Sequence, residues 1–310
     1  MTPARAGDPM TGLKWTRKTT VKVSRELNSA GIVVGARTVA RLLTDLDYRL
    51  RVNHKKLARG TAVCRRERNQ QFEYIHALRQ SFLDRGDPVI SVDTKKKELV
   101  GLFKNPGTVW VKTATPVFDH DFRSDAKAIA VPYGVQDLGA NRGHIFVSTS
   151  HDTPQYAVAA VTRWWKIDGG PRYPDSRRLL ILADNGGSNG SRCRAWKYEL
   201  HNQLCNQHDL EVTVCHYPSG ASKWNPIEHL LFSQISKNWA GVPLENLETM
   251  LNFIRTTKTQ KGLRVRASQI KGHYPTGIRV AVSAMANVNI ITHDVLPTWN
   301  YTIAPGTPKM

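Results

Sequence analysis

Two short apolar runs that each end in aspartate constrain the fold more than any other feature of this sequence. Residues 89–92, VISV, precede Asp93, and residues 179–183, LLILA, precede Asp184. Runs of this length and composition are typical of buried strands. Several strands come first, followed by the order helix–strand–helix–strand–helix, which predicts a mixed α/β sheet with helical crossovers.

The same periodicities predict the other elements of the chain. We expect strands at 98–103 and 211–217, a hairpin over 129–149, and helices at 69–84, 154–167, 191–208 and 226–239. Gly86-Asp87-Pro88 interrupts the pattern, because both glycine and proline disfavour a continuing helix. We therefore expect two domains: residues 1–84, a basic helical DNA-binding region with its linker, and residues 85–310, the α/β domain with a C-terminal extension.

Positive charge is concentrated near the N-terminus. The chain carries a net charge of +19, and residues 1–80 hold 17 Lys/Arg against 6 Asp/Glu, a net of +11. Residues 15–47 predict two short helices around a turn at Gly31, and the second helix presents Arg37 and Arg41. This pattern favours a helix-turn-helix that binds DNA. The alternative is a plain helical hairpin whose arginines are solvated.

Three carboxylates are candidates for a metal-dependent site. Asp93 and Asp184 follow strands, and Glu228 lies in the first turn of the helix after the last predicted strand of the crossover pattern. If the strands are parallel neighbours, the three acids can share Mg²⁺ (or Mn²⁺), since these ions take oxygen ligands and serve phosphoryl transfer. Each acid has a plainer interpretation: Asp93 as a solvated strand end, Asp184 as the start of a turn, and Glu228 as a capping-box acid after Asn225-Pro226.

Further residues rank below these acids. Lys95, Lys96, Lys97 and Lys223 are expected to contact DNA phosphate, with a solvated run as the alternative for the first three. Asp152 is the best rival acid. His216 and His229 are expected to be packed or hydrogen-bonded, and the cysteines do not match a structural zinc pattern.

The motifs resemble those of a known family. The segments VISVDTKKKELVG, LLILADNGGSNGSR and VCHYPSGASKWNPIEHLLFSQI resemble the ISAzo-type insertion-sequence transposases, which belong to the DDE group. The NPIEH run is also similar to the third-acid motif of the mariner-like group. The similarity extends from about Trp15 to Tyr301. It implies an α/β fold, with a ribonuclease-H-like mixed sheet and flanking helices, preceded by a small helix-turn-helix-like domain.

The resemblance also implies a reaction and its partners. Asp93, Asp184 and Glu228 match the family's three acids, so the expected reaction is metal-dependent cleavage at a transposon end. The released 3′ hydroxyl then attacks target DNA. The expected partners are the transposon ends, the target duplex and further copies of the chain on DNA.

The same resemblance leaves two alternatives open. Such transposases usually carry more N-terminal DNA-binding helices, so the chain can also be a truncated, catalytically idle DNA-binding remnant. It can also be a ribonuclease-H-like nuclease without strand transfer. The sequence has no signal-peptide pattern and no apolar run of about 20 residues. We therefore expect a protein of the bacterial cytoplasm, associated with the nucleoid and not with a membrane.

Overall fold

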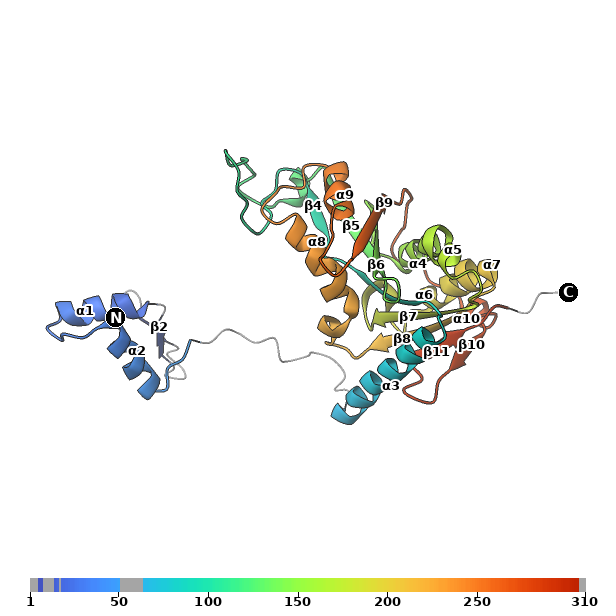
Figure 1. Ribbon diagram of the computed structural model, residues 1–310, viewed down its shortest axis with the longest axis horizontal. Helices are drawn as coiled ribbons and strands as arrows, with labels where there is room; N and C mark the ends of the chain where they lie inside the picture. The colour runs from blue at the N-terminus through green and yellow to red at the C-terminus, as the bar shows by residue number, and fades with distance from the viewer. Residues whose placement is uncertain (1–4, 8–13, 17, 51–63, 307–310) are drawn as a thin grey trace. The chain divides into compact units, whose positions relative to one another are not determined.

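The chain divides into two compact units, Met1–Leu57 and Ala58–Met310. The computed structural model describes residues 5–7, 14–16, 18–50 and 64–306 (Figure 1). Within the N-terminal unit, α1 spans Thr20–Ser29 and α2 spans Ala36–Asp45, which confirms the two predicted helices. A short antiparallel pair, β1 (Arg5–Gly7) and β2 (Lys14–Thr16), precedes them in the chain.

Local hydrogen bonds shape the turn between α1 and α2. Gly31 adopts a φ of 86°, a left-handed conformation that glycine tolerates without a steric penalty. The side chain of Asn28 accepts from the backbone N–H of Val34 at 2.7 Å, and the Ser24 hydroxyl donates to the Val34 carbonyl at 2.6 Å. These bonds explain why the chain turns here between two short helices.

The long helix α3, Arg65–Asp84, belongs to the second unit. Its apolar side contains Ile75 and Phe82, which pack with Leu180 and Leu182 of the sheet. The buried side chain of Gln71 donates to the His216 carbonyl at 2.9 Å and to the side chain of Asn300 at 2.8 Å. The sequence predicts α3 as part of the N-terminal region, and in the structure this helix packs on the sheet of the second unit.

The second unit is built on a nine-stranded mixed sheet. Its strands are β3 Val89–Thr94, β4 Glu98–Val100, β5 Ala128–Asp137, β6 Arg142–Ser148, β7 Arg178–Asp184, β8 Glu211–Tyr217, β9 Arg264–Gln269, β10 Ile290–Thr292 and β11 Asn300–Ile303. The order is β10-β11-β8-β7-β3-β5-β6-β9, and β4 pairs with β5. β3, β5 and β6 form an antiparallel meander, and β7 and β8 add in parallel to β3. This arrangement confirms the expected ribonuclease-H-like mixed sheet.

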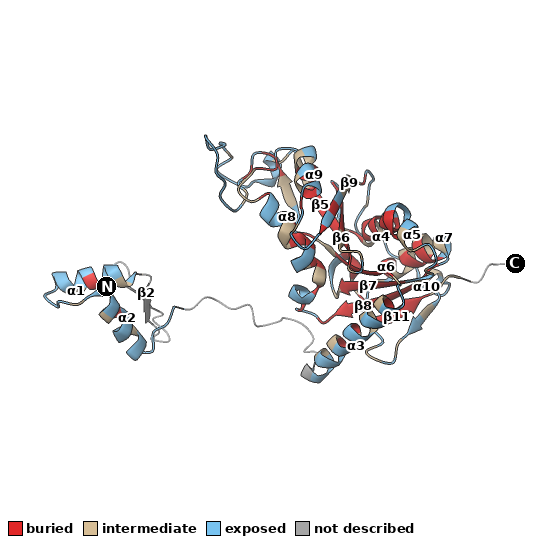
Figure 2. Ribbon diagram, viewed as in Figure 1, coloured by how far each residue is buried: buried red, intermediate tan, exposed pale blue. Residues whose placement is uncertain are grey.

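Helices cover both faces of this sheet (Figure 2). They are α4 Pro154–Trp164, α5 Gly170–Arg172, α6 Arg194–Glu199, α7 Asn206–His208, α8 Ser233–Asn238, α9 Leu247–Arg255 and α10 Val282–Met285. The α4 face is the face on which α4 and α6 pack against Ile90, Val92 and Ile181. The α3 face is the opposite one, covered by α3 and by the helical segment from Pro226 to α8 with α9. Strands buried on both faces explain the uninterrupted apolar runs in the sequence.

Candidate active site

Asp93 and Asp184 lie side by side at the carboxyl ends of two neighbouring strands. β3 and β7 are parallel, and Val92 is level with Ala183, so the next residues in each strand are the two aspartates. Val92 and Ala183 point into the core of the α4 face. Because side chains alternate along a strand, Asp93 and Asp184 both point toward the α3 face, on strands about 5 Å apart.

Asn225 fastens the start of the helix that carries Glu228 to these strand ends. Its fully buried amide donates to the Asp184 carboxylate at 3.1 Å and to the Val92 carbonyl at 3.2 Å. The amide oxygen accepts from the Ser91 hydroxyl, which itself accepts from the backbone N–H of Ile227 at 3.1 Å. The Asn225 side chain is thus bonded to the sheet, whereas the capping-box interpretation required it to close the helix end.

Two glycines let this helix approach the sheet closely. Gly134 of β5 is the direct neighbour of Asp93, and a Cβ there would lie 2.5 Å from Phe232 and 2.7 Å from Ile227. A Cβ at Gly143 of β6 would lie 2.5 Å from Leu231. Glu228 begins a π-helical turn that extends to Phe232. Because glycine has no Cβ at either position, this turn can pack directly against the sheet.

The three carboxylates lie close enough for their charges to interact. Burial, reinforced by the charge of Asp184, raises the pKa of Asp93 to about 8, although the Thr94 N–H opposes this shift. Burial also raises the pKa of Asp184 to about 6, against the hydrogen bond from Asn225 and with a contribution from Glu228. Burial raises the pKa of Glu228, and the charges of His229 and Lys95 oppose it. Crowded anionic groups of this kind favour a bound cation.

Carboxylate oxygens are the ligands that Mg²⁺ and Mn²⁺ prefer, so the chemistry of the donor set fits a divalent ion. Across residues 64–306, however, no three His, Cys, Asp or Glu side chains are already arranged around one position for a metal ion. The structure places Asp93 beside Asp184 and sets Glu228 above them on the helix that Asn225 anchors.

The predicted basic residues have different environments. Lys95 is buried: its ammonium pairs with Glu98 at 2.6 Å and lies 4.5 Å from the centre of the Trp239 ring. Lys96 and Lys97 are exposed and line a pocket of about 370 Å³ together with Asp93 and Asp184.

Outside this pocket, Lys223 is exposed beside Trp224. Arg37 and Arg41 are exposed on α2 of the N-terminal unit.

Asp152 is also close to the aspartates. The Thr94 hydroxyl donates to its carboxylate at 3.0 Å, it lines the same pocket, and its charge contributes to the raised pKa of Asp93. His216, by contrast, is buried and bonded to the Asp184 carbonyl and the Tyr301 hydroxyl, each at 3.1 Å. Burial lowers the pKa of His216 to about 4, as expected for a packed histidine.

Sequence reasoning missed Ser91 and the contact that Asn225 makes with Asp184. Both residues were visible, one inside the apolar run before Asp93 and the other before Pro226. A polar residue inside a fully buried strand needs a hydrogen-bond partner. That signal pointed to a partner for Ser91, although it did not identify Asn225.

The sheet order, with two aspartates at adjoining ends of parallel strands, defines a ribonuclease-H-like fold. The family model described as "Rhodopirellula transposase DDE domain" matches residues 1–305, and the chain belongs to this family of DDE transposases. The resemblance seen in the sequence motifs is thereby confirmed.

Solved structures of the Mos1 transposase are similar to this chain. A Mos1 paired-end complex with the left transposon end matches at 15% identity and a TM-score of 0.45, covering 76% of this chain and 65% of that chain. A Mos1 mariner paired-end complex with Mn matches at 15% identity and a TM-score of 0.42, with the same coverage. The chain thus spans about 65% of the length of these structures. No curated protein matches the sequence. Among the helices of the described residues, none has the length and apolarity to cross a membrane.

Proposed function

We propose that this chain is a DNA transposase that cleaves the ends of an insertion sequence and joins them to target DNA in a metal-dependent reaction. One observation carries the proposal: Asp93 and Asp184 are level on adjacent parallel strands, and Asn225 ties the helix of Glu228 to both strands. Together with membership of the DDE transposase family, this arrangement supports phosphoryl transfer to and from DNA.

Each residue has a proposed role in this reaction. Asp93, Asp184 and Glu228 would hold Mg²⁺ or Mn²⁺, which when bound polarises the phosphate and lowers the pKa of a water. Asn225 keeps the Asp184 carboxylate turned toward the α3 face. Lys96 and Lys97, at the edge of the pocket, are the proposed contacts to the DNA phosphates beside the scissile bond.

We do not extend that role to Lys95, because its ammonium is buried between Glu98 and Trp239. Its charge lowers the pKa of Glu228, so its proposed role is to keep Glu228 ionised. In the N-terminal unit, α2 is the proposed DNA-recognition helix, with Arg37 and Arg41 one helical turn apart on one face. Assembly of several copies on DNA stays a prediction.

The test uses the purified chain, Mg²⁺ and a plasmid that carries the inverted repeats flanking the gene. The proposal expects nicks or breaks at the repeat ends and, with a second plasmid, covalently joined products. Cleavage without joining would point to a ribonuclease-H-like nuclease. DNA binding with neither cleavage nor joining would point to an idle remnant, and either result would reject the proposed transposition reaction.

A further inference from the structure

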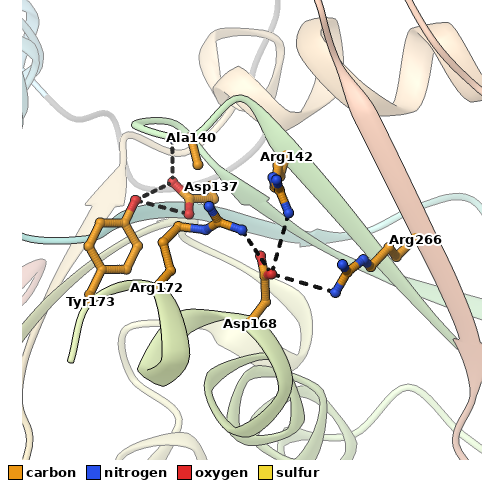
Figure 3. Close-up of polar contacts among 7 residues, drawn as sticks. All are labelled: Asp137, Ala140, Arg142, Asp168, Arg172, Tyr173 and Arg266. Atoms are coloured by element: carbon orange, nitrogen blue, oxygen red, sulfur yellow. Dashed lines mark hydrogen bonds and ion pairs between the residues drawn. The ribbon is translucent and has the colours of Figure 1, made fainter.

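A second polar cluster lies away from the three acids, on the α4 face near the β9 edge of the sheet. Three guanidinium groups converge on one oxygen of Asp168: Arg172 at 3.0 Å, Arg266 at 3.6 Å and Arg142 at 3.7 Å (Figure 3). The carboxylate is only 6% exposed. Of the three cations, Arg172 alone forms a hydrogen bond with it. One buried carboxylate therefore faces three positive charges, and Arg142 and Arg266 retain N–H donors for another acceptor.

Beside this cluster, the strands β6 and β9 form the floor of a pocket of about 420 Å³. Its polar lining residues are His144, Arg255, Arg266 and Ser268, and its apolar ones include Phe146 and Ile167. Arg255 is already paired with Glu248. His144 is level with Arg266, and Arg142 is level with Arg264, so basic side chains follow the edge in register. The Arg266 side chain is 60% exposed, which makes the pocket reachable from solvent.

The ion pairs around Asp168 do not explain why a histidine is buried at position 144. The residue is only 2% exposed, and within the described part of the chain neither ring nitrogen has a hydrogen-bond partner. Burial lowers the pKa of His144 to about 4, with the nearby arginines adding to the shift and Asp168 opposing it. The neutral ring has one N–H donor, and a buried donor without an acceptor is costly. An acceptor bound in the pocket would satisfy it.

We propose that this pocket binds a phosphate group of the DNA backbone, held by Arg266 and the ring N–H of His144 within the pocket and by Arg142 from the neighbouring Asp168 cluster. Phosphate is anionic and rich in acceptor oxygens, and arginine's planar fork of donors suits it. The site is distinct from the one that contains Asp93, because His144 and Arg266 lie on the opposite face and β5 separates β3 from β6. It thus provides a second contact with DNA, independent of the metal chemistry.

The first test measures binding of the full chain to a fluorescent random-sequence duplex without divalent ions, over a range of salt concentrations. Arg142→Gln/Arg266→Gln should weaken binding about tenfold. It should also reduce the salt slope, the slope of the logarithm of the binding constant against the logarithm of the salt concentration, by roughly 1, since one phosphate contact contributes about 0.9. The control Arg177→Gln/Arg178→Gln removes the same charge from exposed positions at the start of β7 and should have a much smaller effect. Equal effects of the two pairs would overturn the site.

His144→Phe separates a phosphate site from general electrostatic attraction. This change removes the ring donor but no charge at neutral pH, so duplex affinity should fall several-fold while the salt slope is unchanged. Unaltered affinity would contradict the role of His144. If Arg142→Gln unfolds the protein by releasing Asp168, Arg266→Gln alone replaces the double variant, because that side chain is mostly exposed.

The source of the phosphate is tested by NMR on the His144 ring, assigned with His144→Phe. Sodium phosphate at millimolar concentration should shift the ring signals, and the duplex should produce its own shift and displace the phosphate. Phosphate binding that the duplex does not displace would overturn the DNA assignment. Because these measurements use no cleavage, their failure would leave the transposition assay unaffected.

Discussion

Asn225 contributes more to the site than its position in the sequence indicates. Asn before Pro at a helix start predicts a cap, a role that stabilises a protein by about 1 kcal/mol. In the structure its side chain bonds to Ser91, Val92 and Asp184. The residue thus joins two strands and a helix, and its loss would leave buried polar groups without partners.

Asn225→Ala should therefore lower the free energy of unfolding by about 2–3 kcal/mol, the cost of buried polar groups without partners. Asn246→Ala is the matched control, because the Asn246 side chain is a true cap that accepts from the Thr249 N–H at 2.8 Å. The control should cost about 1 kcal/mol. Urea denaturation of both variants measures the difference. Equal costs would mean that Asn225 acts only as a helix cap.

Single residues also mark the limits of what could be predicted. Asp93 and Asp184 were identifiable because each ends an apolar run, and the parallel register of β3 and β7 then brings them together. Lys95 looked equivalent to Lys96 and Lys97 in the sequence. In the structure its ammonium lies over the ring of Trp239, which is far away in the sequence. No local sequence pattern predicts that contact.

At the scale of elements, the helix that begins at Pro226 and contains Glu228 depends on two glycines that look unremarkable in the sequence. Gly134 and Gly143 lie within the hairpin that the sequence predicts. Glycine inside a strand normally weakens it, so the sequence alone gives no reason for these two residues. The close approach of Phe232 and Leu231 explains why no larger residue fits.

Gly134→Ala should push this helix away from the sheet, since a Cβ would meet Phe232 at 2.5 Å. We expect a loss of about 1–3 kcal/mol in stability, as for overpacked cores. Mg²⁺-dependent cleavage should fall further than stability accounts for, because Glu228 moves with the helix. The control is Gly190→Ala, whose nearest contact is an ordinary 3.5 Å. Cleavage that stays at the wild-type level in folded Gly134→Ala would disprove this positioning role.

Most elements up to residue 239 were predictable from periodicity, because their apolar spacing is strong. The strand β4 ends at Val100, short of the expected Phe103. The helix expected over 154–167 continues through a π-helical turn to Arg172. The strands β9 to β11 were not predicted. These strands are short or carry exposed polar residues, so their sequences show no strand periodicity. Pairing of β9 with β6 and of β11 with β8 stabilises them as strands.

For the whole molecule, the two compact units divide at Leu57/Ala58, whereas the sequence predicts a domain boundary after residue 84. A protein that starts at Ala58 should unfold cooperatively, as α3 still covers Val89, Leu180 and Leu182. A protein that starts at Arg85 should aggregate or lose its cooperative transition, because that apolar surface becomes exposed. Thermal unfolding of the two fragments provides the comparison. A stable, cooperative 85–310 fragment would restore the boundary expected from the sequence.

The N-terminal unit is expected to supply recognition of DNA through α2. In the full chain, Arg37→Ala/Arg41→Ala should weaken binding to a duplex that carries the terminal repeat by tenfold or more. Lys22→Ala/Arg25→Ala removes the same charge from exposed positions on α1 and serves as the control. Fluorescence anisotropy measures both. If the two double variants bind equally well, charge alone accounts for binding and α2 is not a recognition helix.

The central claim is that Asp93, Asp184 and Glu228 act together, and Glu228→Gln tests it most directly because the sequence also allows Glu228 a plainer role as a helix-capping acid. The variant keeps the size of the side chain and removes the charge that a divalent ion needs. In the Mg²⁺-dependent cleavage assay it should fold, bind DNA and lose almost all cleavage. Glu245→Gln, at an exposed position, should cleave like the wild type. A Glu228→Gln protein that cleaves normally would contradict the account and make Asp152 the next acid to test.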